Sequence, residues 1–119
     1  MADRFEDHRG VIQDLLMTPL DGVTEIFTRK DAVRGNHIHA KTHQWTYIVS
    51  GRLLAAHRDP GTGLTVTREC GPRMLVNEPP GIPHAWRALE DCTVLVFTRG
   101  PRSGENYESD TRRLEVPLL

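Results

Sequence analysis

Hydrophobic and polar positions alternate over short stretches of this chain, and no stretch keeps the 3.6-residue period of an amphipathic helix. Ten glycines and eight prolines interrupt the alternation, at intervals of roughly eight to twelve residues that are typical of β-sandwiches and β-barrels. The pattern predicts an all-β fold with strands at residues 11–17, 23–30, 35–39, 42–49, 52–58, 64–70, 73–76, 84–88 and 93–99.

Two predicted hairpins and one rigid turn connect these strands. Residues 50–52, Ser-Gly-Arg, are a tight hairpin signal, and residues 59–63, Asp-Pro-Gly-Thr-Gly, are a longer one. Residues 77–83 contain three prolines, which lack the amide hydrogen that a central strand needs. We therefore expect this segment to be a rigid turn that places His84 at the start of the next strand.

Length and charge limit the classes of protein to consider. With 119 residues the chain suits a single domain over residues 1–119, large enough for a hydrophobic core. Fifteen Lys and Arg balance sixteen Asp and Glu, so we expect no nucleic-acid surface. No apolar run reaches the roughly 20 residues of a membrane span, and no secretion signal is expected. Cys70 and Cys92 are isolated, as in reduced cytoplasmic proteins.

A histidine-rich segment indicates a site inside the predicted barrel. His37 and His39 are two residues apart, so on a strand both side chains point to one face. Gln44 follows five residues after His39, and Gly51 ends the pattern. Further along, the segment Pro79-x-Gly81-x-x-His84 brings another histidine after the rigid turn. These side chains either converge on one site or are unrelated surface and core residues, and their ordered spacing favours convergence.

The two segments resemble the signature motifs of the cupin superfamily. The resemblance covers residues 33–98 and implies a double-stranded β-helix, or jelly-roll, barrel. It also implies that His37, His39, Gln44 and His84 are metal ligands that face into the barrel. The chain departs from the family pattern twice, because Gln44 stands where Glu is usual and Ala88 stands where Asn is usual.

Four stretches show a narrower resemblance, to the small cupins that act on dTDP-4-keto-6-deoxysugars, namely the 3,5-epimerases and the 3,4-ketoisomerases. The stretches are DHRGVIQDLL at 7–16, VRGNHIHAKTHQW at 33–45, PPGIPHAW at 79–86, and ENYESD at 105–110, which contains Tyr107 and Asp110. Those enzymes generally work without a metal and use histidine as a base. Because they act on sugars, the resemblance implies a sugar-type substrate. The tail, residues 100–119, would pack along the barrel or reach a partner subunit.

The chemistry of such a site depends on whether it holds a metal. Three imidazoles and one amide would leave a divalent transition metal, such as Zn, Fe, Ni or Mn, its full 2+ charge. The ion would acidify protons beside a bound ketone and favour isomerisation, epimerisation or elimination on a keto-sugar or similar substrate. Without a metal, His37 or His39 would be the general base, and Arg34 would bind an anionic substrate group. An iron-dependent dioxygenase and a non-catalytic cupin that binds a small ligand are further alternatives.

The alternation of strand faces assigns the neighbouring aromatic residues. Trp86, two residues after His84, should face inward as a core aromatic or as a wall that stacks on the substrate. His43, Trp45 and Tyr47 have the opposite parity from Gln44 and should face outward. The outward aromatic residues, with Val49, predict a buried contact with another sheet or with a second subunit, and we expect a homodimer.

Overall fold

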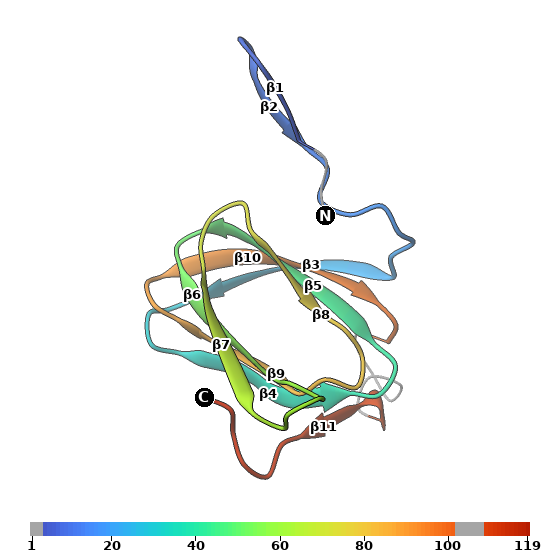
Figure 1. Ribbon diagram of the computed structural model, residues 1–119. Helices are drawn as coiled ribbons and strands as arrows, with labels where there is room; N and C mark the ends of the chain where they lie inside the picture. The colour runs from blue at the N-terminus through green and yellow to red at the C-terminus, as the bar shows by residue number, and fades with distance from the viewer. Residues whose placement is uncertain (1–3, 102–108) are drawn as a thin grey trace.

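The computed structural model describes residues 4–101 and 109–119, and its regular structure is dominated by β-strands (Figure 1). The strands are β1 (Arg4–Asp7), β2 (Gly10–Gln13), β3 (Gly22–Thr28), β4 (Val33–His39), β5 (His43–Ser50), β6 (Leu53–Arg58), β7 (Thr65–Cys70), β8 (Leu75–Glu78), β9 (His84–Ala88), β10 (Cys92–Arg99) and β11 (Thr111–Arg113).

Two antiparallel sheets face each other and form a jelly-roll barrel (Figure 1). The first has strand order β3-β10-β5-β8, and the second has order β11-β4-β9-β6-β7. Among the described strands, β1 and β2 pair only with each other, in a hairpin that projects from the barrel. The prediction of an all-β jelly-roll barrel is confirmed.

Some predicted boundaries are wrong. The strand expected at residues 11–17 ends at Gln13, and the strand expected at 73–76 runs instead from Leu75 to Glu78. The rigid turn therefore begins only at Pro79, because Asn77 and Glu78 still pair with β5. The short strand β11 pairs with β4, so the described part of the tail packs along the barrel.

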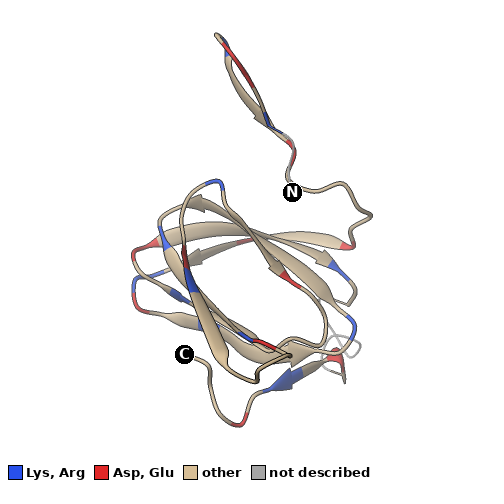
Figure 2. Cartoon of the chain, in the orientation of Figure 1, with Lys and Arg blue, Asp and Glu red and all other residues tan. Residues whose placement is uncertain are grey.

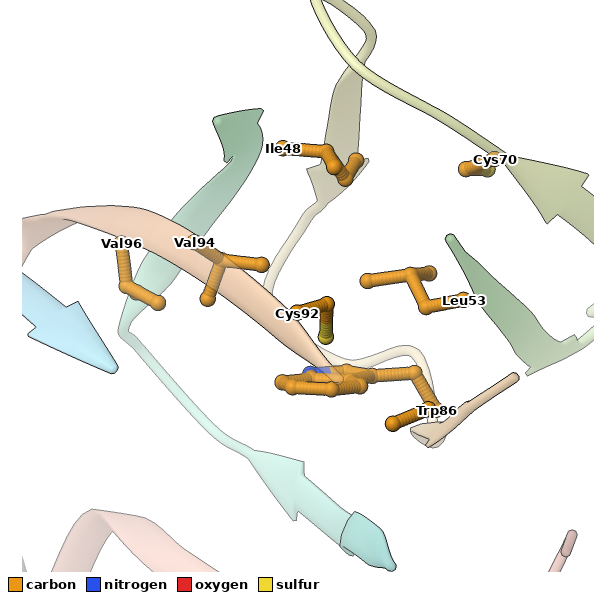
Figure 3. Packing of buried hydrophobic residues seen from close by; sticks show 8 residues of the cluster. Ile48, Leu53, Cys70, Trp86, Cys92, Val94 and Val96 are labelled. Atoms are coloured by element: carbon orange, nitrogen blue, oxygen red, sulfur yellow. The ribbon is translucent and has the colours of Figure 1, made fainter. Parts of the chain in front are cut away.

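The core lies between the two sheets and consists of the inward-facing residues, which occupy alternate positions along the strands (Figure 3). Along β5, Gln44, Thr46 and Ile48 are buried, whereas the residues between them are more exposed. The buried hydrophobic cluster contains Ile48, Leu53, Cys70, Trp86, Ala88, Cys92, Val94 and Val96. Full burial of a Leu or Ile side chain contributes about 1.5–3 kcal/mol, so this cluster stabilises the packing of the two sheets on each other.

The outer face of the first sheet is partly apolar. Trp45 and Tyr47 of β5 are only half-buried there, and Val49 is exposed, which confirms their predicted outward direction. On the edge strand β3, Val23 is 57% exposed and Phe27 is 52% exposed. The homodimer stays a prediction, and this face is the surface on which it would form.

Charged residues of both signs are interspersed over the strands and loops (Figure 2). Within the described ranges, neither sign forms a continuous stripe along a sheet. In the part of the chain that the structure describes, no helix is long and apolar enough to cross a membrane.

A β-bulge in β4 sets the direction of the site histidines. Gly35 pairs with Ala85, but the next pair is His37 with His84, so Asn36 is skipped. Asn36 has a φ of 57°, and Gly35 has a φ of 90°, the left-handed region that Gly and Asn tolerate best. Because the bulge shifts the alternation by one residue, Arg34 and His37 both face the barrel interior.

Candidate functional site

Three histidines from two adjacent strands converge inside the barrel. His37 and His39 come from β4, and His84 begins β9. The ring centroid of His37 lies 4.5 Å from that of His39 and 4.7 Å from that of His84. One ring nitrogen from each of the three lies within 4.8 Å of the others. The structure therefore brings together the three histidines that the motifs singled out.

Each outer histidine of the cluster lies beside a buried carboxylate. Oε2 of Glu78 is 3.2 Å from Nε2 of His84, and Oδ2 of Asp110 is 3.6 Å from Nδ1 of His39. His37 lies between these two pairs, with its Nε2 atom 3.0 Å from Nε2 of His84. The partly buried imidazole of His37 therefore lies next to two other imidazoles, and each of these can share a proton with its carboxylate.

Glu78 was not predicted from the sequence. It is directly opposite Gln44 in the β5–β8 ladder, so both side chains face the interior, and each residue is 7% exposed. The hydroxyl of Thr46 donates a hydrogen bond to Oε1 of Glu78. The available signal was its parity with Val76, but the assignment of residues 77–83 to a turn hid that parity.

Asp110 is held by several hydrogen bonds. Its carboxylate accepts from the backbone amides of Lys41 (2.6 Å) and Thr42 (3.1 Å) and from the Thr42 hydroxyl (2.5 Å). Burial alone would raise the pKa of Asp110, but these hydrogen bonds and nearby His39 hold the pKa below its ordinary value. Tyr107, the other residue noted in the tail motif, lies outside the described residues.

A cavity of about 340 Å³ opens beside the cluster. Its polar lining is Arg34, His37, Gln44, Thr46, Glu78, His84 and Arg113. Arg34 is anchored, because its Nε donates to Oγ1 of Thr28 (2.7 Å) and its Nη2 to the carbonyl of Phe27 (3.3 Å). Arg113, which was not predicted, pairs with His37 across β11 and β4 and is exposed. Two guanidinium groups therefore line the cavity that His37 also lines.

A second cavity, of about 330 Å³, is mostly apolar. It shares Thr46, Glu78, His84 and Trp86 with the first cavity. Trp86 is buried, belongs to the core cluster and lines both cavities, so it faces inward as expected. Its role as a wall that stacks on the substrate stays a prediction. His57 faces the second cavity but is exposed.

His43 lies away from the histidine cluster. Its ring stacks on Trp45 with centroids 3.8 Å apart, and its Nε2 lies 2.5 Å from Oδ1 of Asn77. All three residues belong to the outer face of the first sheet. The face alternation predicted this for His43 and Trp45, whereas Asn77 had been assigned to the turn.

The donor set fits a divalent transition metal, because imidazole nitrogens with an amide or carboxylate oxygen are ligands that such ions accept. The residues that could hold an ion are the predicted His37, His39, Gln44 and His84, together with Glu78.

The comparison with known structures identifies the class of barrel. No family model matches the chain, and no curated protein matches it. The structure is similar to that of dTDP-4-dehydrorhamnose 3,5-epimerase from Sulfolobus tokodaii, with 22% identity and a TM-score of 0.76 over 98% of this chain and 75% of that one. It is also similar to QdtA, a sugar 3,4-ketoisomerase from Thermoanaerobacterium thermosaccharolyticum in complex with TDP, with 20% identity and a TM-score of 0.77 over 96% of this chain and 85% of that one.

A third similar structure is larger. The capsular polysaccharide assembling protein CapF from Staphylococcus aureus matches with 21% identity and a TM-score of 0.72, over 98% of this chain and 33% of CapF. This chain thus spans about a third of CapF. At these identities the likeness establishes the fold alone, a jelly-roll barrel like those of the similar epimerase and ketoisomerase.

Proposed function

We propose that this protein is an isomerase or epimerase that moves a proton on a keto-sugar linked to an anionic, nucleotide-type group. The observation that carries the proposal is that His37 shares one cavity with two guanidinium groups, those of Arg34 and Arg113. A base and an anion-binding pair at the same cavity suit a substrate whose reacting carbon and negative charge belong to one molecule.

His37 is the residue best placed to be the base. It lines the cavity and is less buried than its neighbours His39 and His84. Its imidazole would remove the proton from the carbon next to the ketone, and the electron pair of that C–H bond would form an enolate. Delivery of a solvent proton to the opposite face gives the epimer, and the proton held by His37 passes to solvent. The isomeric ketone forms when the proton of the neighbouring hydroxyl moves to the former carbonyl oxygen and His37 returns its proton to the former carbonyl carbon.

The neighbouring groups would stabilise the charged state of this base. After taking a proton, His37 becomes a cation close to His84 and Glu78 on one side and to His39 and Asp110 on the other. The two buried carboxylates favour that cation and hold the flanking rings in place. General base catalysis of this kind contributes about 10²–10⁴-fold to the rate.

Arg34 and Arg113 would bind the anionic end of the substrate. Guanidinium groups form paired, charge-assisted hydrogen bonds with phosphate oxygens. The similar ketoisomerase is known in complex with TDP, which supports a nucleotide as the anionic part. A metal-assisted form of the same isomerisation is the second candidate, because the spacing of the histidine nitrogens also suits an ion.

The test uses TDP-4-keto-6-deoxyglucose, the sugar bound to a variant of the similar ketoisomerase. The protein is incubated with this compound in D₂O and EDTA, and proton NMR follows the exchange of hydrogens beside the ketone. We expect exchange by the parent, loss of about 10²-fold or more in His37→Asn, and parent-like exchange in the control His43→Asn. Absence of exchange in the parent, or exchange only after a metal is added, would contradict the metal-independent mechanism.

A further inference from the structure

We infer that Glu78, and not Gln44, supplies the oxygen ligand of a divalent transition-metal site formed with His37 and His84. This inference goes beyond the proposed function, because binding of the ion requires no substrate. It also differs from the ligand set that the sequence motif implies, in which Gln44 of β5 is the ligand beside the three histidines.

The first argument is the spacing of the ligand atoms. Two ligands that bind one ion at right angles, each about 2.1 Å away, are about 3.0 Å apart. The Nε2 atoms of His37 and His84 are 3.0 Å apart, and Oε2 of Glu78 is 3.2 Å from Nε2 of His84. Both separations from Nε2 of His84 therefore match the spacing of ligands around one ion, and the three residues line one cavity.

The second argument is the set of contacts that orient the histidines. Metal-binding histidines usually direct their other ring nitrogen at a carboxylate or a backbone carbonyl. Nδ1 of His84 lies 3.4 Å from the carbonyl of Ile82, which leaves Nε2 facing His37 and Glu78. Nδ1 of His39 contacts Thr111 at 3.0 Å and Asp110 at 3.6 Å, so His39 would bind the same ion through Nε2 as a fourth ligand.

The third argument is charge. A buried carboxylate is costly unless it is paired with a cation, and Glu78 is 7% exposed next to neutral or singly charged imidazoles. Its Oε1 accepts a hydrogen bond from Thr46, whereas its Oε2 faces His84. One oxygen is thus fixed by the protein and the other is directed at the cluster. Gln44, directly opposite on β5, has a neutral amide that offers an ion no compensating charge.

The site has a consequence for the proton transfer. A nitrogen of His37 that binds an ion has no lone pair left to accept a proton. Metal loading and base catalysis by His37 therefore exclude each other, so an ion bound by these ligands would inhibit the metal-independent reaction.

The test is a titration of the metal-free protein, purified without a histidine tag, with Co²⁺ alone. Visible absorption and calorimetry report the coordination and the affinity. We expect one Co²⁺ per chain in the parent and at least about 10-fold weaker binding, with a changed spectrum, in Glu78→Gln. The controls Gln44→Ala and His43→Ala should bind within about threefold of the parent. No binding by the parent, or loss in Gln44→Ala with parent-like binding in Glu78→Gln, would overturn the inference.

A second measurement avoids dependence on how the variants fold. Proton NMR of the Co²⁺-loaded parent should show strongly shifted side-chain signals from Glu78, whereas those of Gln44 should be less affected. The reverse pattern would overturn the inference. Neither measurement contains substrate, so a protein that binds Co²⁺ through Glu78 but exchanges no sugar hydrogens would refute only the proposed function.

Discussion

The carboxylate of Asp110 lies 3.6 Å from Nδ1 of His39 and joins the tail of the chain to the centre of the barrel. The same carboxylate accepts hydrogen bonds from Lys41 and Thr42 at the turn before β5. One side chain therefore ties the site to both the tail and the turn after β4, and its loss should affect stability as well as the histidines.

The low pKa of Asp110 predicts how stability depends on pH. Because folding lowers this pKa, the carboxylate stabilises the fold above its unfolded pKa, and this contribution is lost as the pH falls through the folded value. We expect Asp110→Asn to destabilise the protein by about 1–3 kcal/mol at pH 7 and much less near pH 2. Urea unfolding across this range measures the effect, with the exposed-acid variant Glu115→Gln as control. An equal loss at both pH values would contradict the prediction.

The bulge at Gly35 predicts a strong effect of one methyl group. A Cβ at Gly35 would lie 2.9 Å from Cα of Ala85, and the φ of 90° already disfavours a side chain. We expect Gly35→Ala to destabilise the protein by more than about 2 kcal/mol. Gly81→Ala is the matched control, since Gly81 has a φ of 80° but no atom within 4 Å of an added Cβ. Equal unfolding free energies for the two variants would show that the contact with β9 does not matter.

Arg113 predicts where nucleotide affinity arises. Removing one charge-assisted contact costs about 1.5–3 kcal/mol, so Arg113→Ala should weaken binding of TDP by about 10- to 100-fold in calorimetry. The adjacent Arg112 pairs with Ile38 and points to the opposite face, so Arg112→Ala should bind TDP like the parent. Parent-like binding by Arg113→Ala would place the anion elsewhere.

The outer face of the first sheet predicts the oligomeric state. Val23 and Phe27 expose apolar surface on β3, and half-buried Tyr47 and Trp45 lie on the same face of β5, with β10 between the two strands. Burial of such a surface stabilises association. Light scattering should give twice the 13.5 kDa of the chain. Phe27→Glu should give a monomer, whereas Leu64→Glu, at an exposed residue away from this face, should leave the dimer intact. A monomeric parent would refute the prediction.

The sequence could predict the barrel and the convergence of its histidines because both follow from alternation. Burial alternates strictly along residues 44–49, so Gln44 and His43 lie on the expected faces. The bulge at Asn36 could not be predicted, since a regular strand would place Arg34 and His37 on opposite sides. Glu78 and Arg113 were missed for a related reason. Each reaches the site through strand pairing with a residue distant in sequence, and pairing is a tertiary property.

The position of Trp86 gives the barrel its own optical reporter. The chain has two tryptophans, and only Trp86 lines the two cavities, whereas Trp45 stacks on His43 outside. In a protein carrying Trp45→Phe, the remaining indole fluorescence would come from Trp86, a residue that lines both cavities. Entry of a sugar nucleotide or of a quenching ion such as Co²⁺ would then change the emission without any attached dye.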